Sequence, residues 1–363
     1  MKLCLVFGTR PQIIKSVPIV RECRRKDVSL TIVNTGQHYD YEMSRVFFDK
    51  LGLPEPQFDL GVGSGTHAQQ TGSVMVATET TLLKIKPDIC IVPGDTNSAI
   101  GSCLASVKLK IPVAHLEAGL RSHEEFMAEE INRKVIDHSS RYLFAPTRNA
   151  VDNLEREGIP SDKITLTGDT MYDLYLSEKP LIDASELPDD RLRSGNYVLM
   201  TLHRQENTED AIALIRALEA VTAQKINAVL PVHPRTAALI EREGLSKRIG
   251  EQSDVIMTPP LPYHQLMRTM RDASAVLTDS GGVQKEAFMS KVPCITLRPS
   301  TEWTETVSTG GNILVSEIDA ELLKDTIKHV LQDRQRIINN ISKAGSLFGD
   351  GKAAERAIRS LLA

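Results

Sequence analysis

The sequence has 363 residues, a length that predicts two domains or one unusually large α/β domain. Hydrophobic residues make up 41% of the sequence and charged residues 25%, which excludes a disordered or fibrous protein. The net charge of −4 is spread without long runs of one sign, so the composition favours neither a nucleic-acid-binding surface nor one for anionic lipid. We therefore expect any bound anion to be held by a few individually placed cations.

The N-terminal residues contain neither the apolar run of a signal peptide nor the roughly 20 apolar residues of a membrane span. Four of the five cysteines, Cys4, Cys90, Cys103 and Cys294, lie in apolar stretches, and the chain has no CxxC pair. This pattern is typical of buried, reduced thiols. The nine histidines show no HxxxH or HxH spacing, so a catalytic metal is not expected. We expect a soluble, cytoplasmic protein with no membrane segment.

Short apolar segments rich in Val, Ile and Leu alternate along the chain with amphipathic segments. This pattern predicts parallel β-sheets with helices on both faces. The first six expected strands are 3–7, 30–34, 89–92, 113–115, 142–144 and 164–167. The next six are 197–201, 228–231, 255–257, 275–278, 294–297 and 313–315.

The segment 177–196 between the two sets of strands is acidic and contains the breakers Pro180, Pro188 and Gly195, and we expect no regular element in it. It therefore marks the boundary between a first domain, 1–176, and a second domain, 177–345. A last helical segment within 346–363 is expected to pack back on the first domain. Each half is predicted to be a doubly wound parallel sheet of α/β class, with ligands bound at the carboxyl ends of the strands, in the crevice between the halves.

The first expected strand runs into a glycine-containing turn and then into a helix with Pro11 near its start. Arg10 and Lys15 lie about one turn apart on that helix. Together with the N–H groups of the helix N-terminus, these cations suit a phosphate. The alternative is an ordinary βα turn with a surface arginine and a lysine whose stem lies along the protein surface.

Three carboxylates follow the third and fourth expected strands. Asp95 comes directly after one strand, Glu117 after the next, and Glu129 at the start of the following helix. Carboxylates at neighbouring strand ends repel one another, which prepares one as an acid and one as a base. Asp95 has an alternative role as a helix N-cap, and Glu129 with Glu130 has one in stabilising the helix dipole.

In the second half, His203 and His233 each follow one of two neighbouring strands. Their imidazoles are suited to contact a phosphate or a leaving group.

The most specific local signal in the second half is a strand followed by Ser280, Gly281 and Gly282 and then a helix that contains Glu286. The glycines let backbone N–H groups approach an anion, and Glu286 can accept hydrogen bonds from the two hydroxyls of a ribose. The alternative is a strand–turn–helix connection that binds no ligand. Together with Arg10, this turn predicts a nucleoside diphosphate clamped between the two domains.

Eight motifs in chain order resemble those of the non-hydrolysing UDP-N-acetylglucosamine 2-epimerases, over essentially the whole chain. They are Phe7-Gly8-Thr9-Arg10-Pro11, Gly94-Asp95-Thr96, His115-Leu116-Glu117-Ala118-Gly119-Leu120-Arg121, Glu129-Glu130-Ile131-Asn132-Arg133, His203-Arg204, Pro231-Val232-His233-Pro234, Thr278-Asp279-Ser280-Gly281-Gly282 with Glu286, and Gly349-Asp350-Gly351. The resemblance implies a GT-B fold, in which two Rossmann-like domains flank the active-site cleft, and a homodimer. It also implies that the enzyme needs neither a metal nor a nicotinamide cofactor.

The reaction that the resemblance implies inverts C2 of the amino sugar. UDP is eliminated to leave a 2-acetamidoglycal, and UDP is then added back after protonation from the other face. The resemblance gives acid–base roles to Asp95, Glu117 and Glu129, and it makes His203 and Arg10 assist the departing diphosphate.

The same resemblance assigns the UDP-binding residues. Ser280, Gly281 and Gly282 would hold the phosphates, Glu286 the ribose, and the backbone around Leu261 the uracil. Lys15 and His233 would lie at the rim of the site.

Three positions differ from the pattern of the family. Gln12 replaces a common Glu, a change that need not alter the chemistry. The stretch 37–43 is longer than in relatives activated by their own substrate, and Gln205 replaces their second Arg, which implies that the allosteric substrate site is lost. Trp303 replaces a usual Arg, as in relatives acting on UDP-2,3-diacetamido-glucuronate or UDP-N-acetyl-fucosamine; the alternative for this only tryptophan is simple packing.

The resemblance therefore predicts an isomerase that interconverts UDP-N-acetylglucosamine and UDP-N-acetylmannosamine for the synthesis of surface polysaccharide precursors. A 2-epimerase of one of the other two UDP-amino sugars is the first alternative. A hydrolysing epimerase, a GT-B glycosyltransferase and a non-catalytic nucleotide-sugar sensor are the others.

Overall fold

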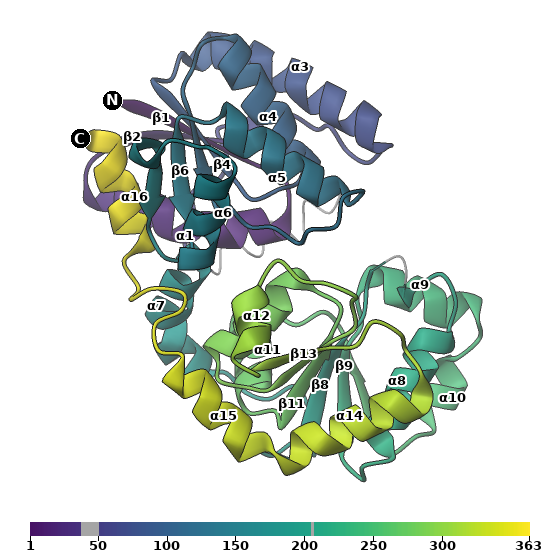
Figure 1. Ribbon diagram of the computed structural model, residues 1–363. Coiled ribbons are helices and arrows are strands. Elements are labelled where there is room, and N and C mark those ends of the chain that lie inside the picture. The colour runs from purple at the N-terminus through teal and green to yellow at the C-terminus, as the bar shows by residue number, and fades with distance from the viewer. Residues whose placement is uncertain (38–50, 205–206) are drawn as a thin grey trace. The chain divides into compact units, whose positions relative to one another are not determined.

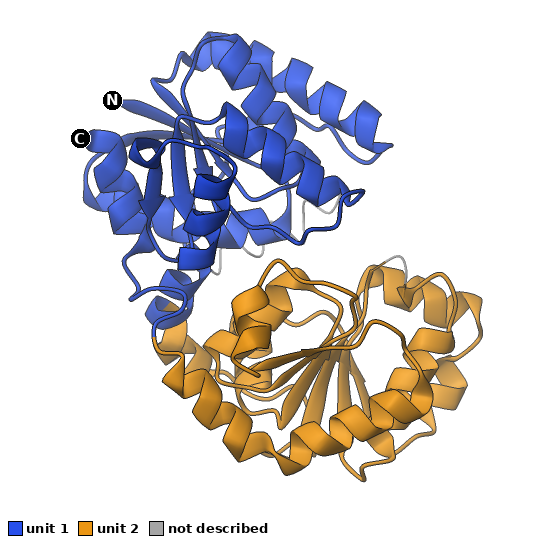
Figure 2. Cartoon of the chain, in the orientation of Figure 1, with its two compact units in different colours: residues 1–177, 346–363 blue, residues 178–345 orange. Residues whose placement is uncertain are grey.

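The computed structural model describes residues 1–37, 51–204 and 207–363. These residues form two compact units (Figure 2). The first unit holds residues 1–177 and 346–363, and the second holds residues 178–345. Each unit is a parallel β-sheet covered by helices (Figure 1), so the predicted α/β class with doubly wound sheets is confirmed.

The sheet of the first unit has seven parallel strands in the order β3-β2-β1-β4-β5-β6-β7. The strands are β1 (Lys2–Phe7), β2 (Ser29–Asn34), β3 (Phe58–Asp59), β4 (Ile89–Pro93), β5 (Val113–Leu116), β6 (Tyr142–Ala145) and β7 (Ile164–Leu166). The helices are α1 (Arg10–Arg25), α3 (His67–Ile85), α4 (Asn97–Lys108), α5 (Ala128–Ser139), α6 (Arg148–Arg156), the short 3₁₀ helix η1 (Ser161–Lys163), α7 (Thr170–Ala184) and α16 (Ala353–Leu362). Helices α3, α4 and α5 pack side by side (Figure 1).

The strands of this sheet form because their side chains are apolar on both faces. All residues of β4 and β5 are buried, and Cys4, Cys90 and Cys103 belong to the same core cluster. The six strands predicted from apolar runs are all present. The edge strand β3 was not predicted, because it has only two residues, one of them an aspartate, and shows no run of apolar residues.

The order of the strands reverses between β1 and β4, since the chain leaves β1 toward β2 on one side and returns to β4 on the other. In open parallel sheets, ligands bind outside the carboxyl ends of the strands at this switch point. Residues Gly8 to Arg10 follow β1, and Gly94 and Asp95 follow β4. The topology therefore brings two of the predicted motifs to the position where such a sheet binds ligands.

The second unit repeats this plan with six parallel strands in the order β10-β9-β8-β11-β12-β13. The strands are β8 (Tyr197–Thr201), β9 (Asn227–Pro231), β10 (Val255–Thr258), β11 (Ala275–Thr278), β12 (Cys294–Thr296) and β13 (Asn312–Leu314). The helices are α8 (Ile212–Thr222), α9 (Pro234–Arg242), α10 (Ser246–Gly250), α11 (Tyr263–Arg271), α12 (Gly281–Met289), α13 (Thr304–Ser308), α14 (Ala320–Gln332) and α15 (Arg334–Lys343). The switch point lies between β8 and β11, where His203 and Ser280 follow the strands.

The segment 177–196 is partly helical, which corrects the expectation that it holds no regular element. Helix α7 continues through Pro180 to Ala184, and the boundary between the two units falls within it. An interior proline costs a helix about 3 kcal/mol, but Ile182 is fully buried. Burial of this side chain favours the helix over the local breaker signal that the sequence presents.

The C-terminal helix α16 belongs to the first unit and packs against α1 (Figure 1). The carboxylate of Asp173 accepts hydrogen bonds from the backbone N–H groups of Ala353, at 3.0 Å, and of Ala354, at 2.8 Å. An acidic group at a helix N-terminus satisfies the unpaired N–H groups there. None of the described helices combines the length and the apolarity that a membrane span requires.

Candidate active site

The turn after β1 is shaped by close contacts. A Cβ atom on Gly8 would lie 1.9 Å from the hydroxyl of Thr35 and 2.3 Å from that of Ser98, so only glycine fits there. The side-chain oxygen of the buried Gln12 accepts hydrogen bonds from the N–H groups of Gly8, at 2.9 Å, and Thr9, at 3.2 Å. These two N–H groups are therefore already paired. Arg10 begins α1 and is half-buried.

Asp95 is held by two side chains of α5. The carboxylate of Asp95 receives the Nε of Arg133 at 2.8 Å and its Nη2 at 2.7 Å. The side chain of Asn132 donates to the Asp95 backbone carbonyl at 2.8 Å. The N-cap of α4 is the neighbouring Thr96, which accepts from the N–H of Ala99, so the alternative role of Asp95 as that cap is wrong.

Glu117 adopts an unusual backbone conformation and pairs with Lys15. Its φ of 66° lies in the left-handed region, which is costly for a residue other than glycine and often marks a functional site. The ammonium of Lys15 forms an ion pair with Oε2 of Glu117, and both side chains are largely buried. Lys15 thus supplies the counter-charge of a carboxylate, a contact that the sequence did not predict.

The two glutamates at the start of α5 differ in their surroundings. Glu130 is fully buried and accepts hydrogen bonds from the N–H of Ser122, at 2.9 Å, and from Nη1 of Arg133, also at 2.9 Å. Burial opposes ionisation of Glu130, yet these hydrogen bonds and the charge of Arg133 hold its pKa below the usual value. Glu129 is half-buried, and no described residue donates a hydrogen bond to its side chain. Glu130 therefore supports the fold, which leaves Glu129 as the candidate for chemistry.

A hollow of about 350 Å³ adjoins these residues. It lies where the N-terminal turns of α3, α4 and α5 meet, and its lining includes His67, Asn97, Ile131 and Asn132. Asn132 is the residue that holds the backbone of Asp95.

In the second unit, the structure brings His203 and His233 together. Their ring centroids are 4.9 Å apart, as expected for residues that follow the paired strands β8 and β9. Burial lowers the pKa of His203 below its usual value, although the nearby carboxylate of Asp279 acts in the opposite direction. At neutral pH, His203 is therefore suited to donate a hydrogen bond from a neutral ring. His233 is exposed and caps α9 by accepting from the N–H of Arg235 at 3.3 Å.

The turn after β11 is fixed by Asp279 and Ser280. The fully buried carboxylate of Asp279 accepts from the N–H groups of His203, at 3.0 Å, and Arg204, at 2.9 Å. It thus ties the ends of β8 and β11 together. Ser280 is the N-cap of α12, whose first residues are Gly281 and Gly282, so backbone N–H groups are presented at a helix N-terminus as the sequence predicted.

A buried ion pair covers Gly281. Nη1 of Arg298 donates to Oε2 of Glu302 at 3.1 Å, and a Cβ atom on Gly281 would lie 2.3 Å from Oε1 of Glu302. Arg298 is 3% exposed, and its Nη2 has no hydrogen-bond partner among the described residues. This arginine, which the sequence analysis did not select, therefore has an unused donor beside the predicted phosphate-binding turn.

The remaining predicted residues of the second unit are largely buried. Glu286 is 6% exposed and lies in α12, and Leu261 is 7% exposed and precedes α11. Trp303 is 3% exposed, and the ammonium of Lys285 lies 4.4 Å from the centroid of its indole ring. Such a cation–π contact stabilises a buried lysine, and Trp303 thus has a packing role within this unit.

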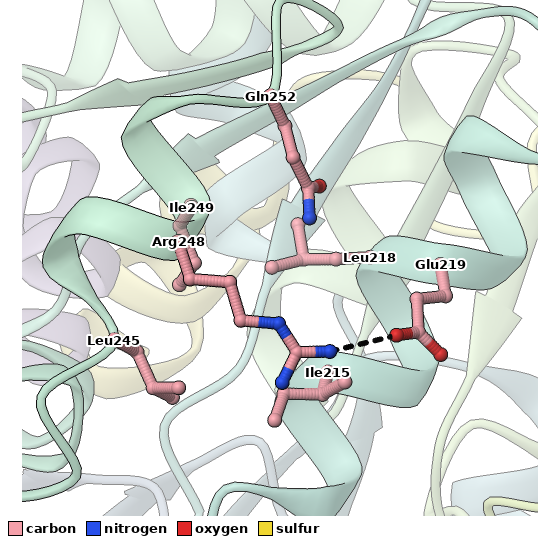
Figure 3. Close-up of a pocket in the computed structure, with 7 residues that line it drawn as sticks. All are labelled: Ile215, Leu218, Glu219, Leu245, Arg248, Ile249 and Gln252. Carbon is pink, nitrogen blue, oxygen red and sulfur yellow. Dashed lines mark hydrogen bonds and ion pairs between the residues drawn. The ribbon is translucent and has the colours of Figure 1, made fainter.

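A second, smaller hollow lies between α8 and α10 (Figure 3). Nη2 of Arg248 donates to Oε1 of Glu219 at 3.2 Å beside it. Its volume of about 10 Å³ accommodates roughly one water molecule, and none of the predicted site residues lines it. Among the residues that the structure describes, no three His, Cys, Asp or Glu side chains are grouped so that they could hold a metal ion.

Comparison with known proteins yields one family. The family model described as UDP-N-acetylglucosamine 2-epimerase matches residues 21–362. The chain belongs to the UDP-N-acetylglucosamine 2-epimerase family. The resemblance found in the sequence motifs is therefore confirmed, and the chain is an isomerase of this family.

Two curated members of the epimerase family are similar over almost the full length. The UDP-N-acetylglucosamine 2-epimerase of Methanocaldococcus jannaschii is 40% identical, with 99% of each chain covered. The UDP-2,3-diacetamido-2,3-dideoxy-D-glucuronate 2-epimerase of Pseudomonas aeruginosa is 41% identical, with 98% of each chain covered. A crystal structure of the M. jannaschii enzyme in complex with UDP-GlcNAc and UDP matches with a TM-score of 0.89 at 39% identity, covering 100% of this chain and 99% of that one. The predicted GT-B fold is confirmed by this match.

One prediction concerns residues that the structure does not describe, and several residues of the candidate site were not selected from the sequence. Residues 38–43 and Gln205, on which the predicted loss of an allosteric site depends, are outside the described part of the chain. The side chains that hold the candidate residues, Arg133, Asp279 and Arg298, were not selected as site residues. Arg133 and Asp279 stood within recognised motifs, but their partners Asp95 and His203 lie far away in sequence. Arg298 stood in no motif.

Proposed function

We propose that this family member is a UDP-N-acetylglucosamine 2-epimerase that works by elimination and re-addition of UDP. The observation that supports this most directly is the set of carboxylates at the switch point of the first unit. Asp95 and Glu117 each face a cation, Arg133 and Lys15 respectively, and Glu129 is free of bonds to described side chains. A binding protein or a simple glycosyltransferase has no need for three such groups.

In the proposed reaction, one carboxylate removes the proton from C2 of the amino sugar. The electron pair of the C2–H bond forms the C1=C2 double bond, and the C1–O bond breaks to release UDP. A second carboxylic acid then delivers a proton to the opposite face of C2, and the β-phosphate oxygen adds back to C1. Removal and return of a weakly acidic proton by separate groups is general acid–base catalysis, for which Asp95, Glu117 and Glu129 are the proposed groups.

The residues of the second unit are proposed to hold the UDP of the same substrate. The N–H groups at the start of α12, with Ser280, Gly281 and Gly282, are suited to the diphosphate, and Arg298 has an unused donor beside them. His203 would hydrogen-bond the departing β-phosphate, with Arg10 and Lys15 as cations and His233 at the rim. Glu286 is proposed for the ribose and the backbone around Leu261 for the uracil.

The identity of the sugar is a separate proposal. The curated relatives that act on UDP-N-acetylglucosamine and on UDP-2,3-diacetamido-2,3-dideoxy-D-glucuronate are 40% and 41% identical to this chain, so overall identity favours neither. The eight motifs favour the first substrate, and Trp303 favours the second. UDP-2,3-diacetamido-glucuronate is therefore the alternative substrate.

The experiment that tests this function is proton NMR of the purified protein in D₂O with UDP-N-acetylglucosamine, and in parallel with UDP-2,3-diacetamido-glucuronate. We expect new anomeric signals of the C2 epimer and deuterium at C2. Release of UDP with a free sugar would identify a hydrolysing epimerase instead. Epimerisation without incorporation of deuterium at C2 would contradict the elimination route. Turnover of UDP-2,3-diacetamido-glucuronate alone would identify that sugar nucleotide as the substrate.

A homodimer that supplies surface polysaccharide precursors in the cytoplasm completes the proposal. The five free, buried cysteines suit a reducing compartment. Size-exclusion chromatography with light scattering tests the oligomeric state. A monomer at the concentration used in the activity assay would contradict the proposed homodimer.

A further inference from the structure

A buried ionic chain links the two loops that carry Asp95 and Glu117. It runs from the carbonyl of Gly94 through His115 and Asp137 to the N–H of Gly119 and the guanidinium of Arg121. The side chains of His115 and Asp137 are fully buried. A chain of charges in the core is costly to desolvate, so its presence next to the candidate carboxylates calls for a physical reason.

Both ring nitrogens of His115 face hydrogen-bond acceptors. Its Nε2 lies 2.9 Å from the backbone oxygen of Gly94, which can only accept a hydrogen bond. Its Nδ1 lies 2.7 Å from Oδ1 of Asp137. The other oxygen of that carboxylate already accepts from the N–H of Gly119, at 3.1 Å, and from Nη1 of Arg121, at 2.8 Å.

Asp137 is therefore an ionised acceptor on both oxygens. Burial would raise the pKa of Asp137, but the charges and hydrogen bonds of His115 and Arg121 outweigh it and keep the pKa below the usual value. With acceptors on both sides, a neutral imidazole would point a lone pair at one of them. A ring with hydrogens on both nitrogens would donate in both directions.

Each end of this chain is attached to an unusual piece of backbone. Gly94, with a φ of 67°, directly precedes Asp95, and Gly119, with a φ of 83°, follows Glu117 by two residues. Glu117 itself has a φ of 66°. Glycine adopts such φ values without strain, but a left-handed glutamate persists only where the surrounding contacts over-determine it. The hydrogen bond from the Gly119 N–H to Asp137 is one such contact near Glu117.

We propose that His115 is a positioning residue, whose buried imidazolium, paired with Asp137, sets the spacing of Asp95 and Glu117 by binding the Gly94 carbonyl while Asp137 binds the Gly119 N–H. This inference rests on the acid–base roles proposed above for the two carboxylates. His115 touches no substrate in this scheme, and it acts through the backbone of the two turns. It adds a side-chain link beyond the last backbone hydrogen bond between the two strands, which the Gly94 N–H donates to the Leu116 carbonyl.

The test compares one variant each of His115 and Asp137 with a variant of Glu157, which lies at the Arg121 end of the same ionic chain. In His115→Gln and Asp137→Asn, kcat is expected to fall by about 10- to 100-fold, as for other groups that orient catalytic residues. KM and the Kd for UDP are expected to stay within about threefold of wild type, a change of well under 1 kcal/mol. The UDP-binding candidates of the second unit are not touched by either substitution.

Glu157→Gln is the matched control. Glu157 binds Arg121 through Nε at 2.7 Å and Nη2 at 2.6 Å, and it contacts neither glycine turn. Its loss weakens the same buried charge chain, so it is expected to lower Tm while leaving kcat within about twofold of wild type. A purely structural role for His115 would instead make kcat follow Tm in all three variants, which would overturn the proposal.

A measurement on the wild-type enzyme covers the case in which the variants do not fold. With ¹⁵N-labelled histidine, His115 is expected to show two N–H signals that are protected from solvent exchange, because both ring nitrogens are buried donors. A buried histidine with one unprotonated nitrogen would overturn the proposal. Full turnover in Asp95→Asn or Glu117→Gln would instead refute the proposed function, which makes the two failures distinguishable.

Discussion

The two units share one topology but carry different kinds of site at their switch points. In the first unit, candidate carboxylates are paired with cationic side chains, Asp95 with Arg133 and Glu117 with Lys15. In the second, the residues at the switch point present backbone N–H groups and a histidine with a lowered pKa. Under the proposed function, the same strand order would serve proton transfer in one unit and anion binding in the other. Fold alone therefore does not determine the chemistry.

The largest expected effect is a loss of kcat that leaves UDP binding intact. Asp95→Asn and Glu117→Gln remove a proton-transfer group but keep its shape, so kcat is expected to fall by about a thousandfold or more. The affinity for UDP, measured by calorimetry, is expected to stay within about threefold. Glu155→Gln, which changes an exposed carboxylate of α6, is the control. Unchanged turnover in either variant would refute the acid–base assignment.

A smaller loss of kcat is expected when the positive charge beside Asp95 is kept but the shape of the group that carries it is changed. Arg133 binds Asp95 and Glu130 at once with its planar fork, whereas a lysine presents a single charged point. Arg133→Lys is expected to lower kcat by about tenfold to a hundredfold. The exposed Arg148, which pairs with Asp152, gives the control Arg148→Lys. Equal kinetics in the two variants would contradict the role of Arg133.

For Gly281→Ala in the second unit, a loss of UDP affinity with little change in kcat is expected. The added Cβ would lie 2.3 Å from Oε1 of Glu302, and the Arg298–Glu302 pair would have to move away from the start of α12. The Kd for UDP is expected to rise by about tenfold, or 1.4 kcal/mol, with kcat at saturating substrate little changed. A Cβ on Gly250 would meet no atom within 4 Å, so Gly250→Ala is the control. A lower kcat with unchanged UDP affinity would invert the comparison between the units.

The last prediction concerns stability alone, and no effect on activity is expected because Asp173 lies outside both sites. Burial raises the pKa of Asp173 to about 6, although the N–H groups of Ala354 and Ala353 oppose the shift. Because the folded-state pKa exceeds the unfolded one, the contribution of Asp173 is present at about pH 4 and is lost as the pH rises through about 6. The free energy of unfolding of wild type relative to Asp173→Asn should therefore fall by on the order of 2 kcal/mol between those pH values. Denaturant titrations at both pH values check this, and a pH-independent difference would contradict it.

Sequence patterns predicted the strands well because each strand is continuously apolar and long enough to show it. They failed at β3, which has only two residues, and in α7, where the buried Ile182 favours a helix that the nearby Pro180 argues against. At the sites, the turns after the strands were predictable, because parallel topology places them at one edge. The pairings of Arg133 and Lys15 were not, since contacts between residues distant in sequence depend on tertiary packing. Arg298 pairs with Glu302, four residues later, in a segment outside the recognised motifs.

The attachment of α16 to the first unit has a consequence for how the chain folds during synthesis. The residues of the second unit, 178–345, are contiguous, whereas the first unit needs residues from both ends of the chain. The second unit can complete its core before residues 346–363 are in place, but α1 and Asp173 must wait for the last helix to emerge. The unit that carries the carboxylates, although synthesised first, is thus the one completed last.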